Sequence, residues 1–152
     1  MNQAFFMDII SWGLIGLFSG SFLSATIIPF PSEGLLIAFY EMDYPIYYCL
    51  LIATIGNTLG GLTNYGLGRF GSSDWVIAKF KLNPERLNKW EARFSKHGYL
   101  LGLLAWLPFI GDPMVVVLGI LRVKFWPLTI MILIGKFARY AILTWIYLQA
   151  LG

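Results

Sequence analysis

The sequence predicts an all-α integral membrane protein. Its expected core is an inverted repeat of two re-entrant helical hairpins, each followed by a transmembrane helix, with a cytoplasmic amphipathic helix between the repeats. Three observations lead to this prediction. Of the 152 residues, 58% are hydrophobic and only 12% are charged, whereas a soluble domain carries about a quarter charged residues. Two similar proline-containing motifs interrupt the apolar stretches, and the basic residues gather between the two halves.

The two interruptions resemble each other and lie 79 residues apart: Pro29-Phe30-Pro31-Ser32-Glu33 and Pro108-Phe109-Ile110-Gly111-Asp112. Each places an acid shortly after a Pro-Phe pair. A charged side chain at the bilayer centre costs about 2.5–3.5 kcal/mol on insertion scales, so intramembrane acids are candidates for function. We expect Glu33 and Asp112 to couple transport to protons or ions. The residues expected to support the hairpin turns are Pro29, Pro31, Pro108, Gly111 and Pro113.

The second interruption favours a hairpin over a straight span. The stretch 98–121 is long enough to cross a bilayer, but the break divides it into two legs of half that length. A hairpin would return Arg122 and Lys124 to the side of the basic loop, as the positive-inside rule requires. Non-helical backbone at this depth must be covered by protein or line a wet cavity. We expect the first break to form a hairpin from the opposite face. Whether residues 5–28 cross fully is left open.

The charge pattern divides the chain into three parts of one membrane domain. Residues 1–68 form the first repeat, with its turn near 29–33, and residues 98–152 the second, with its turn near 108–113. Seven of the eleven Lys and Arg residues lie in the loop 69–97, which we therefore expect to be cytoplasmic. This loop should contain an amphipathic helix that starts at Asn83-Pro84-Glu85 and binds anionic lipid at the inner membrane surface.

Helix-start chemistry offers a structural interpretation of the two hairpin acids. Asp112 followed by Pro113 is typical of an N-cap with proline at the first helical position, and Ser32 can cap a helix that begins at Glu33. Both acids could therefore serve only to start short helices. Alternatively, two helix N-termini with ionisable carboxylates could handle an anion, a proton or both. The two interpretations can coexist.

Basic residues in the last apolar stretch, 125–150, could compensate these acids. Lys136 and Arg139 are three residues apart and therefore share a helical face. Structural ion pairing with the acids is one explanation. The other is that they bind an anionic head group, for which the guanidinium of Arg139 offers a bidentate fork. Arg69 and Arg122, expected nearer the cytoplasmic rim, are candidates for binding the same group.

The expected span 45–68 is unusually rich in small and amide residues. Asn57, Gly60 and Asn64 fall on one helical stripe. This stripe could support the hairpin turns or line a polar path, while close helix contact is the simpler explanation. The same face is a candidate surface for self-association.

Several stretches together resemble a known family. They are 24–33, 53–65 with Gly68-Arg69, 106–113, and Gly135-Lys136 with Arg139-Tyr140. They are similar to the DedA (SNARE-associated, VTT-domain) membrane proteins, and within them to the short YqaA-like branch. This resemblance implies a bacterial inner-membrane protein with two facing re-entrant hairpins. The family is associated with proton-driven translocation of lipid phosphates such as undecaprenyl phosphate, or with scrambling of phospholipids. The family's arginine before the second hairpin turn is absent here.

We therefore expect a proton-linked transporter of a lipid phosphate. An energy-independent lipid scramblase or small-ion carrier is one alternative, and a structural or assembly protein is another. Enzymatic hydrolysis is not expected, because one histidine outside the apolar stretches and scattered acids supply no catalytic set. We also expect no cofactor and no metal. The expected partners are membrane lipids and a second copy of the chain, without nucleic acid.

Overall fold

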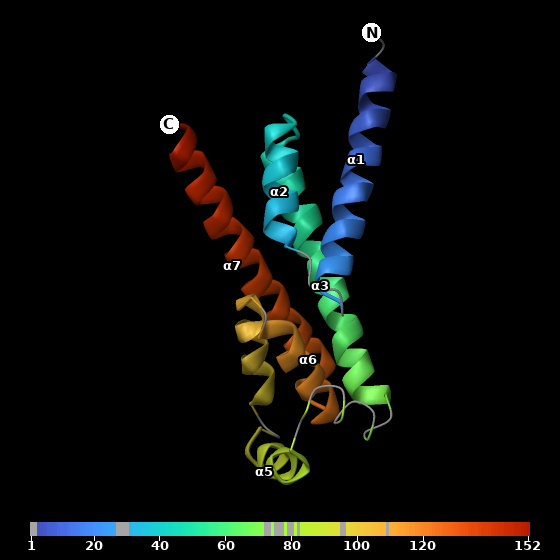
Figure 1. The fold of residues 1–152 in the computed structure, drawn as a ribbon, viewed down its shortest axis with the longest axis vertical. Coiled ribbons are helices and arrows are strands. Elements are labelled where there is room, and N and C mark those ends of the chain that lie inside the picture. Colours follow the sequence, from blue (N-terminus) through green and yellow to red (C-terminus); the bar gives the residue numbers. More distant parts are fainter. Residues whose placement is uncertain are drawn as a thin grey trace. The chain divides into compact units, whose positions relative to one another are not determined.

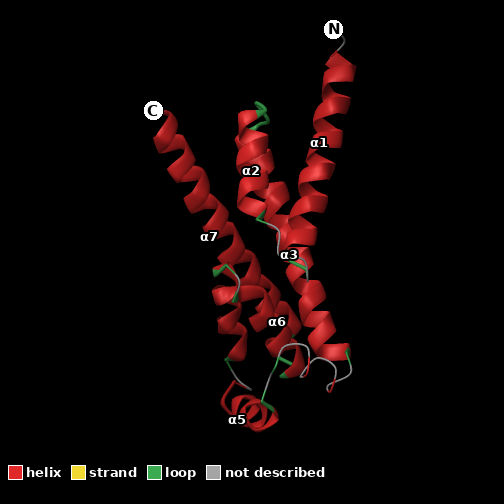
Figure 2. Ribbon diagram, viewed as in Figure 1, coloured by secondary structure: helices red, strands yellow, loops and turns green. Residues whose placement is uncertain are grey.

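The computed structural model describes residues 3–26, 31–71, 83–94, 97–108 and 110–152, together with residues 74, 78 and 81. The helices are α1 (Gln3–Ser24), α2 (Ser32–Glu41), α3 (Ile46–Phe70), α5 (Pro84–Phe94), the 3₁₀ helix η1 (Gly98–Trp106), α6 (Gly111–Ile120) and α7 (Phe125–Leu151) (Figure 1). No strand occurs in the described ranges (Figure 2). The predicted all-α class is confirmed.

The two longest helices coincide with the predicted spans 45–68 and 125–150. Helix α3 has 25 residues and α7 has 27, and both are long and apolar enough to cross a membrane. At about 1.5 Å per residue they extend roughly 37–40 Å, against about 30 Å for the hydrocarbon core. Helix α1 is a single helix of 22 residues.

The two predicted interruptions are present as breaks between helices. Helix α2 follows α1 after residues 25–31, and α6 follows η1 after residues 107–110. Both α2 and α6 have 10 residues, so each is about 15 Å long, half the thickness of a bilayer core. In each case the two legs pack against each other, and α1 and α2 run in opposite directions (Figure 1).

The repeat extends to the backbone hydrogen bonds, in a constant register of 79 residues. Both short helices end in a Schellman motif, in which a residue with positive φ follows the last helical turn. Tyr44 donates its backbone N–H to the Phe39 carbonyl at 3.1 Å, and Val123 donates to the Leu118 carbonyl at 3.1 Å. The positive-φ residues are Asp43 (φ 60°) and its equivalent Arg122 (φ 50°).

The strained residue in the first of these turns gives a stability prediction. Replacing Asp43 with glycine should raise the free energy of unfolding by about 0.5–1 kcal/mol, because left-handed backbone costs L-residues about 1–2 kcal/mol and the greater unfolded-state freedom of glycine offsets part of the gain. Reversible unfolding in mixed micelles would measure the change. The neighbouring Met42, with φ −88°, is the matched control, and Met42→Gly should be destabilising. Equal effects at both positions would contradict the prediction.

The chain forms two compact units that divide it differently from the repeat. Unit 1 consists of Met1–Gly60 and Phe137–Gly152, and unit 2 of Gly61–Lys136. Each long helix therefore contributes one segment to each unit. Buried core residues of unit 1 are Leu17, Leu36, Tyr40, Cys49, Ala53 and Tyr140. Those of unit 2 are Tyr65, Ala105, Val115, Leu118, Val123, Leu128 and Ile132.

Glycines bring helix backbones into direct contact inside each unit. A Cβ atom on Gly56 of α3 would lie 2.6 Å from the carbonyl oxygen of Phe18 on α1. In unit 2, a Cβ on Gly68 of α3 would meet the carbonyl of Val116 on α6. No side chain fits in such a gap, so the small residues of α3 allow close helix packing.

Helix α5 starts where the sequence predicts. The side-chain oxygen of Asn83 accepts hydrogen bonds from the backbone N–H groups of Glu85 at 2.9 Å and Arg86 at 3.4 Å, as an N-cap residue does. The helix ends at Phe94. Trp90 on this helix is exposed.

Candidate ion-pair sites in the two units

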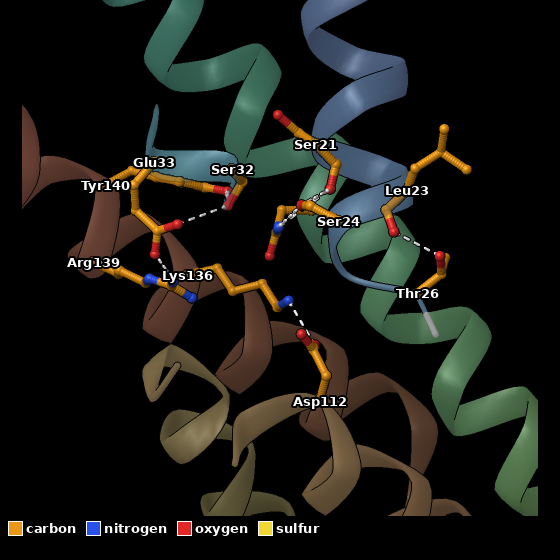
Figure 3. A network of polar contacts seen from close by, with 11 residues as sticks. Ser21, Leu23, Ser24, Thr26, Ser32, Glu33, Asp112, Lys136, Arg139 and Tyr140 are labelled. Atoms are coloured by element: carbon orange, nitrogen blue, oxygen red, sulfur yellow. Dashed lines mark hydrogen bonds and ion pairs between the residues drawn. The ribbon is translucent and has the colours of Figure 1, made fainter. Parts of the chain in front are cut away.

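The first hairpin acid forms an ion pair within unit 1. Glu33 is the second residue of α2, and its Oε1 pairs with the guanidinium of Arg139 on α7 (Figure 3). Both side chains remain partly accessible, at 29% and 19%. Next to this pair, Ser32 Oγ lies 3.5 Å from the other carboxylate oxygen, and the Tyr140 hydroxyl donates to Ser32 Oγ at 2.8 Å.

The second hairpin acid forms the corresponding contact within unit 2. Asp112 is the second residue of α6, and Lys136 Nζ on α7 lies 3.0 Å from its Oδ1 (Figure 3). The lysine side chain is only 1% exposed and the aspartate side chain 30%. A Cβ on Gly61 would lie 3.3 Å from Lys136 Cε and 3.6 Å from Asp112 Oδ1. The glycine of α3 therefore leaves room for the ion pair.

The capping roles predicted for Ser32 and Asp112 are wrong. Both helices begin earlier than expected, so the N-cap positions are occupied by Pro31 and Ile110, and neither makes a side-chain capping bond. The two acids at the second helical positions pair instead with bases on α7. They still lie in the first turn, where the positive end of the helix dipole favours a carboxylate.

The residues predicted to support the hairpin turns lie at the breaks. Pro31 immediately precedes α2, and the Pro108 carbonyl accepts a 2.8 Å bond from the N–H of Ile110. Gly111 is required because a Cβ there would lie 2.6 Å from the carbonyl oxygen of Ala105. Pro113 occupies the first turn of α6, where its missing N–H breaks no helical bond. Pro29 lies outside the described residues.

The predicted rim arginines lie away from Asp112. Arg122 follows the far end of α6, about 15 Å along a helix of ten residues. Arg69 is exposed in the last turn of α3 and donates from Nη1 to the Tyr65 hydroxyl at 2.9 Å. That hydroxyl donates to the Val123 carbonyl at 2.7 Å. Arg69 is thereby linked to the turn that contains Arg122.

The amide residues of α3, Asn57 and Asn64, are buried. Asn57 Nδ2 donates to the Ser21 carbonyl at 3.2 Å and to Ser24 Oγ at 3.0 Å. These bonds attach the last turn of α1 to α3 just before the first break. Asn64 is buried within unit 2.

Sequence reasoning missed a set of hydroxyl contacts between α2 and α7 in unit 1. Tyr40 Oη and Thr144 Oγ1 are 2.8 Å apart, and the Tyr147 hydroxyl donates to Glu41 Oε1 at 2.8 Å. On α7, Tyr140, Thr144 and Tyr147 follow an i, i+4, i+7 spacing, which places them on one face. This spacing is the feature of the sequence from which a shared polar face on α7 could have been predicted.

The chain thus has two long apolar helices and two short helices that follow breaks. Each short helix carries an acid that pairs with a base on α7. These features define a class of all-helical protein with discontinuous helices. Residues 30–149 match the VTT domain, and the chain belongs to this family, the DedA proteins, in its YqaA-like branch.

Curated relatives agree with this assignment. The chain is 36% identical over 129 residues to inner membrane protein YqaA of Escherichia coli K12, covering 84% of this chain and 85% of the relative. It has the same similarity to inner membrane protein YqaA of Shigella flexneri. An uncharacterized protein of Haemophilus influenzae is 34% identical over 139 residues, covering 84% of this chain and 82% of the relative. No solved structure matches the chain.

Proposed function

We propose that this protein is a multi-pass transporter of the bacterial inner membrane that moves a lipid phosphate, of the undecaprenyl phosphate or phospholipid class, in a proton-linked manner. One observation carries the proposal: each short helix presents a carboxylate that is paired with a base on the apolar helix α7. Intramembrane acids and bases are expensive and typically serve ion or substrate pathways. The name of the E. coli relative supports the inner membrane.

Ion-pair exchange would link phosphate binding to a proton in unit 1. The guanidinium of Arg139 can bind two phosphate oxygens in place of the Glu33 carboxylate. In apolar surroundings, a carboxylate without a paired cation has a higher free energy than the neutral carboxylic acid. Glu33 would therefore bind a proton once Arg139 is released from it. The Lys136–Asp112 pair would act similarly in unit 2. Discontinuous helices in transporters commonly provide such sites.

The proposed topology puts the loop 69–97 in the cytoplasm and makes both hairpins re-entrant. Arg69 and Arg122 would then receive the head group at the cytoplasmic rim, and α5 would lie on anionic lipid. The starts of α3 and α7 carry exposed aromatic residues in the same repeat register, Tyr47 at 82% and Trp126 at 75% exposure. Such residues favour membrane–water interfaces.

The remaining parts of the proposal concern chemistry and assembly. Transport would be the whole function, without an enzymatic step, cofactor or resident metal. The partners would be lipids rather than nucleic acid. Self-association of the chain would help to enclose the substrate path, because two hairpins and two long helices give only a small membrane domain.

Movement of a fluorescent polyprenyl phosphate into proteoliposomes, with and without an imposed pH gradient, tests the proposal. We expect gradient-driven movement in the wild type and a loss of roughly tenfold or more in Glu33→Gln, because the amide cannot exchange a proton. Glu85→Gln, an exposed substitution on α5, is the matched control and should behave as wild type. Each variant is first shown to fold by its elution profile and helical content.

Other outcomes would point to the alternatives. Movement that ignores the gradient in every variant would identify a scramblase and contradict proton linkage. Lower abundance of Glu33→Gln with unchanged activity per molecule would identify a structural role for the ion pair. Absence of any movement in the wild type would contradict transport of this lipid class.

A further inference from the structure

The contact between α2 and α7 in unit 1 contains a row of hydroxyl groups. From one end to the other, Tyr147 donates to Glu41, Tyr40 bonds to Thr144, and Tyr140 donates to Ser32 beside Glu33. The four central members, Ser32, Tyr40, Tyr140 and Thr144, are all buried. The row leads from exposed Glu41 to the Glu33–Arg139 ion pair.

The equivalent contact in unit 2 shows that packing does not require these hydroxyls. In the 79-residue register, Ser32 and Tyr40 of α2 correspond to Gly111 and Gly119 of α6. Tyr140 and Tyr147 of α7 correspond to Gly61 and Gly68 of α3. There, Gly68 and Gly119 bring the backbones of α3 and α6 into contact. At these positions in unit 2, the short and the long helix therefore meet through glycines and not through hydroxyl groups.

We propose that the hydroxyl row is a proton route between water at Glu41 and the Glu33–Arg139 pair. This inference rests on the proposed proton-linked function. A hydroxyl can accept one proton while it gives up its own, so a proton passes along the row without net change in any member. Glu41 takes the proton from water, and Glu33 receives it when its carboxylate is released from Arg139.

The spacing of the row suits stepwise transfer. Tyr140, Thr144 and Tyr147 lie one helical turn apart on α7, about 4.5–6 Å along the axis. The rings of Tyr40 and Tyr147 are 5.1 Å apart, centre to centre. Two of the hydroxyls must first rotate, because Thr144 Oγ1 donates to the Tyr140 backbone carbonyl at 2.7 Å and Tyr147 donates to Glu41. Rotation of these hydroxyls toward the next member of the row, or one water molecule between neighbours, would complete the steps.

The charges around the row are arranged at its two ends. Glu41 and Asp43 act on Tyr147 at the outer end, while Glu33 and Arg139 form the inner end. Along the middle, the buried thiol of Cys49 lies beside Tyr40. The acids at the outer end attract protons from solution.

The test separates proton movement from lipid movement in proteoliposomes. A trapped pH-sensitive dye reports proton uptake driven by a potassium–valinomycin potential, with and without polyprenyl phosphate. Fluorescent polyprenyl phosphate reports exchange without any gradient. In Tyr40→Phe and Tyr140→Phe, which each remove one oxygen and keep the ring, proton uptake should fall roughly tenfold or more while gradient-free exchange stays near the wild-type rate. Tyr44→Phe, in the same unit but outside the row, should change neither.

A second pair of variants tests the route independently, in case the tyrosine variants do not fold. Thr144→Ser keeps the hydroxyl and should retain proton uptake, whereas Thr144→Val should lose it. Unchanged proton uptake in the Phe and Val variants would overturn the route, as would parallel loss of proton uptake and exchange in folded variants. Wild-type protein that takes up no protons under either condition would overturn it too. If the wild type takes up protons but moves no polyprenyl phosphate, the proposed function fails, and the variants still decide the route.

Discussion

Replacing Asp112 with asparagine is expected to lower the free energy of unfolding by about 3 kcal/mol. Lys136 is 1% exposed, so the substitution removes an opposite charge from a buried ammonium group, and breaking a buried ion pair in this way typically costs about 3–5 kcal/mol. The lower end of this range applies because Asp112 itself is partly accessible. Reversible unfolding in mixed micelles at neutral pH would measure the loss.

A neutral pair provides the control for this prediction. In Asp112→Asn combined with Lys136→Met, both charges of the pair are removed, and most of the lost stability should return. The double variant should therefore be more stable than Asp112→Asn alone. If it is equally unstable or worse, the aspartate acts through something other than charge compensation.

Adding one methyl group to Gly68 is expected to be the most damaging small change in unit 2. Its Cβ would collide with the Val116 carbonyl and approach Ile120 N at 3.1 Å, so Gly68→Ala must separate α3 from α6. Overpacking of this kind costs about 1–3 kcal/mol, and the backbone atoms cannot rotate away as a side chain can. We expect a cost near the top of that range in the free energy of unfolding.

Gly66, two residues earlier on the same helix, is a strict control. A Cβ there meets nothing within 4 Å, so Gly66→Ala should instead stabilise the protein by about 0.8–1 kcal/mol through helix propensity. The two substitutions are chemically identical and should have opposite signs. Two changes of the same sign would show that the backbone contact at Gly68 does not limit the packing.

The sequence was sufficient for the features that depend on local residues. Proline and glycine at 108–113 predicted the break before α6, and the long apolar stretches predicted α3 and α7. The two similar motifs that contain Glu33 and Asp112 predicted two similar short helices. In the structure, α2 and α6 begin and end 79 residues apart. These predictions required no knowledge of which helices touch.

The partners of the acids could not be predicted in the same way. The repeat equivalents of Lys136 and Arg139 are Asn57 and Gly60, so the symmetry of the sequence gives no rule for pairing. Which base reaches which acid depends on the packing of segments far apart in the chain. The start of α2 was misplaced for a related reason: the N-cap preference of serine contributes only about 1 kcal/mol, and Ser32 instead lies inside the helix, where it accepts a hydrogen bond from Tyr140 on α7.

The composition of unit 1 affects how the protein is made. Ser32 and its partner Tyr140 are 108 residues apart, and synthesis at about 5–20 residues per second takes roughly 5–20 s to cover that distance. Throughout this interval Glu33 has been made but Arg139 has not. Until α7 has been made, Glu33 therefore lacks the base with which it pairs in the folded protein. Assembly of the first hairpin is completed after translation has reached α7, so the earliest helices of the chain are among the last to be secured.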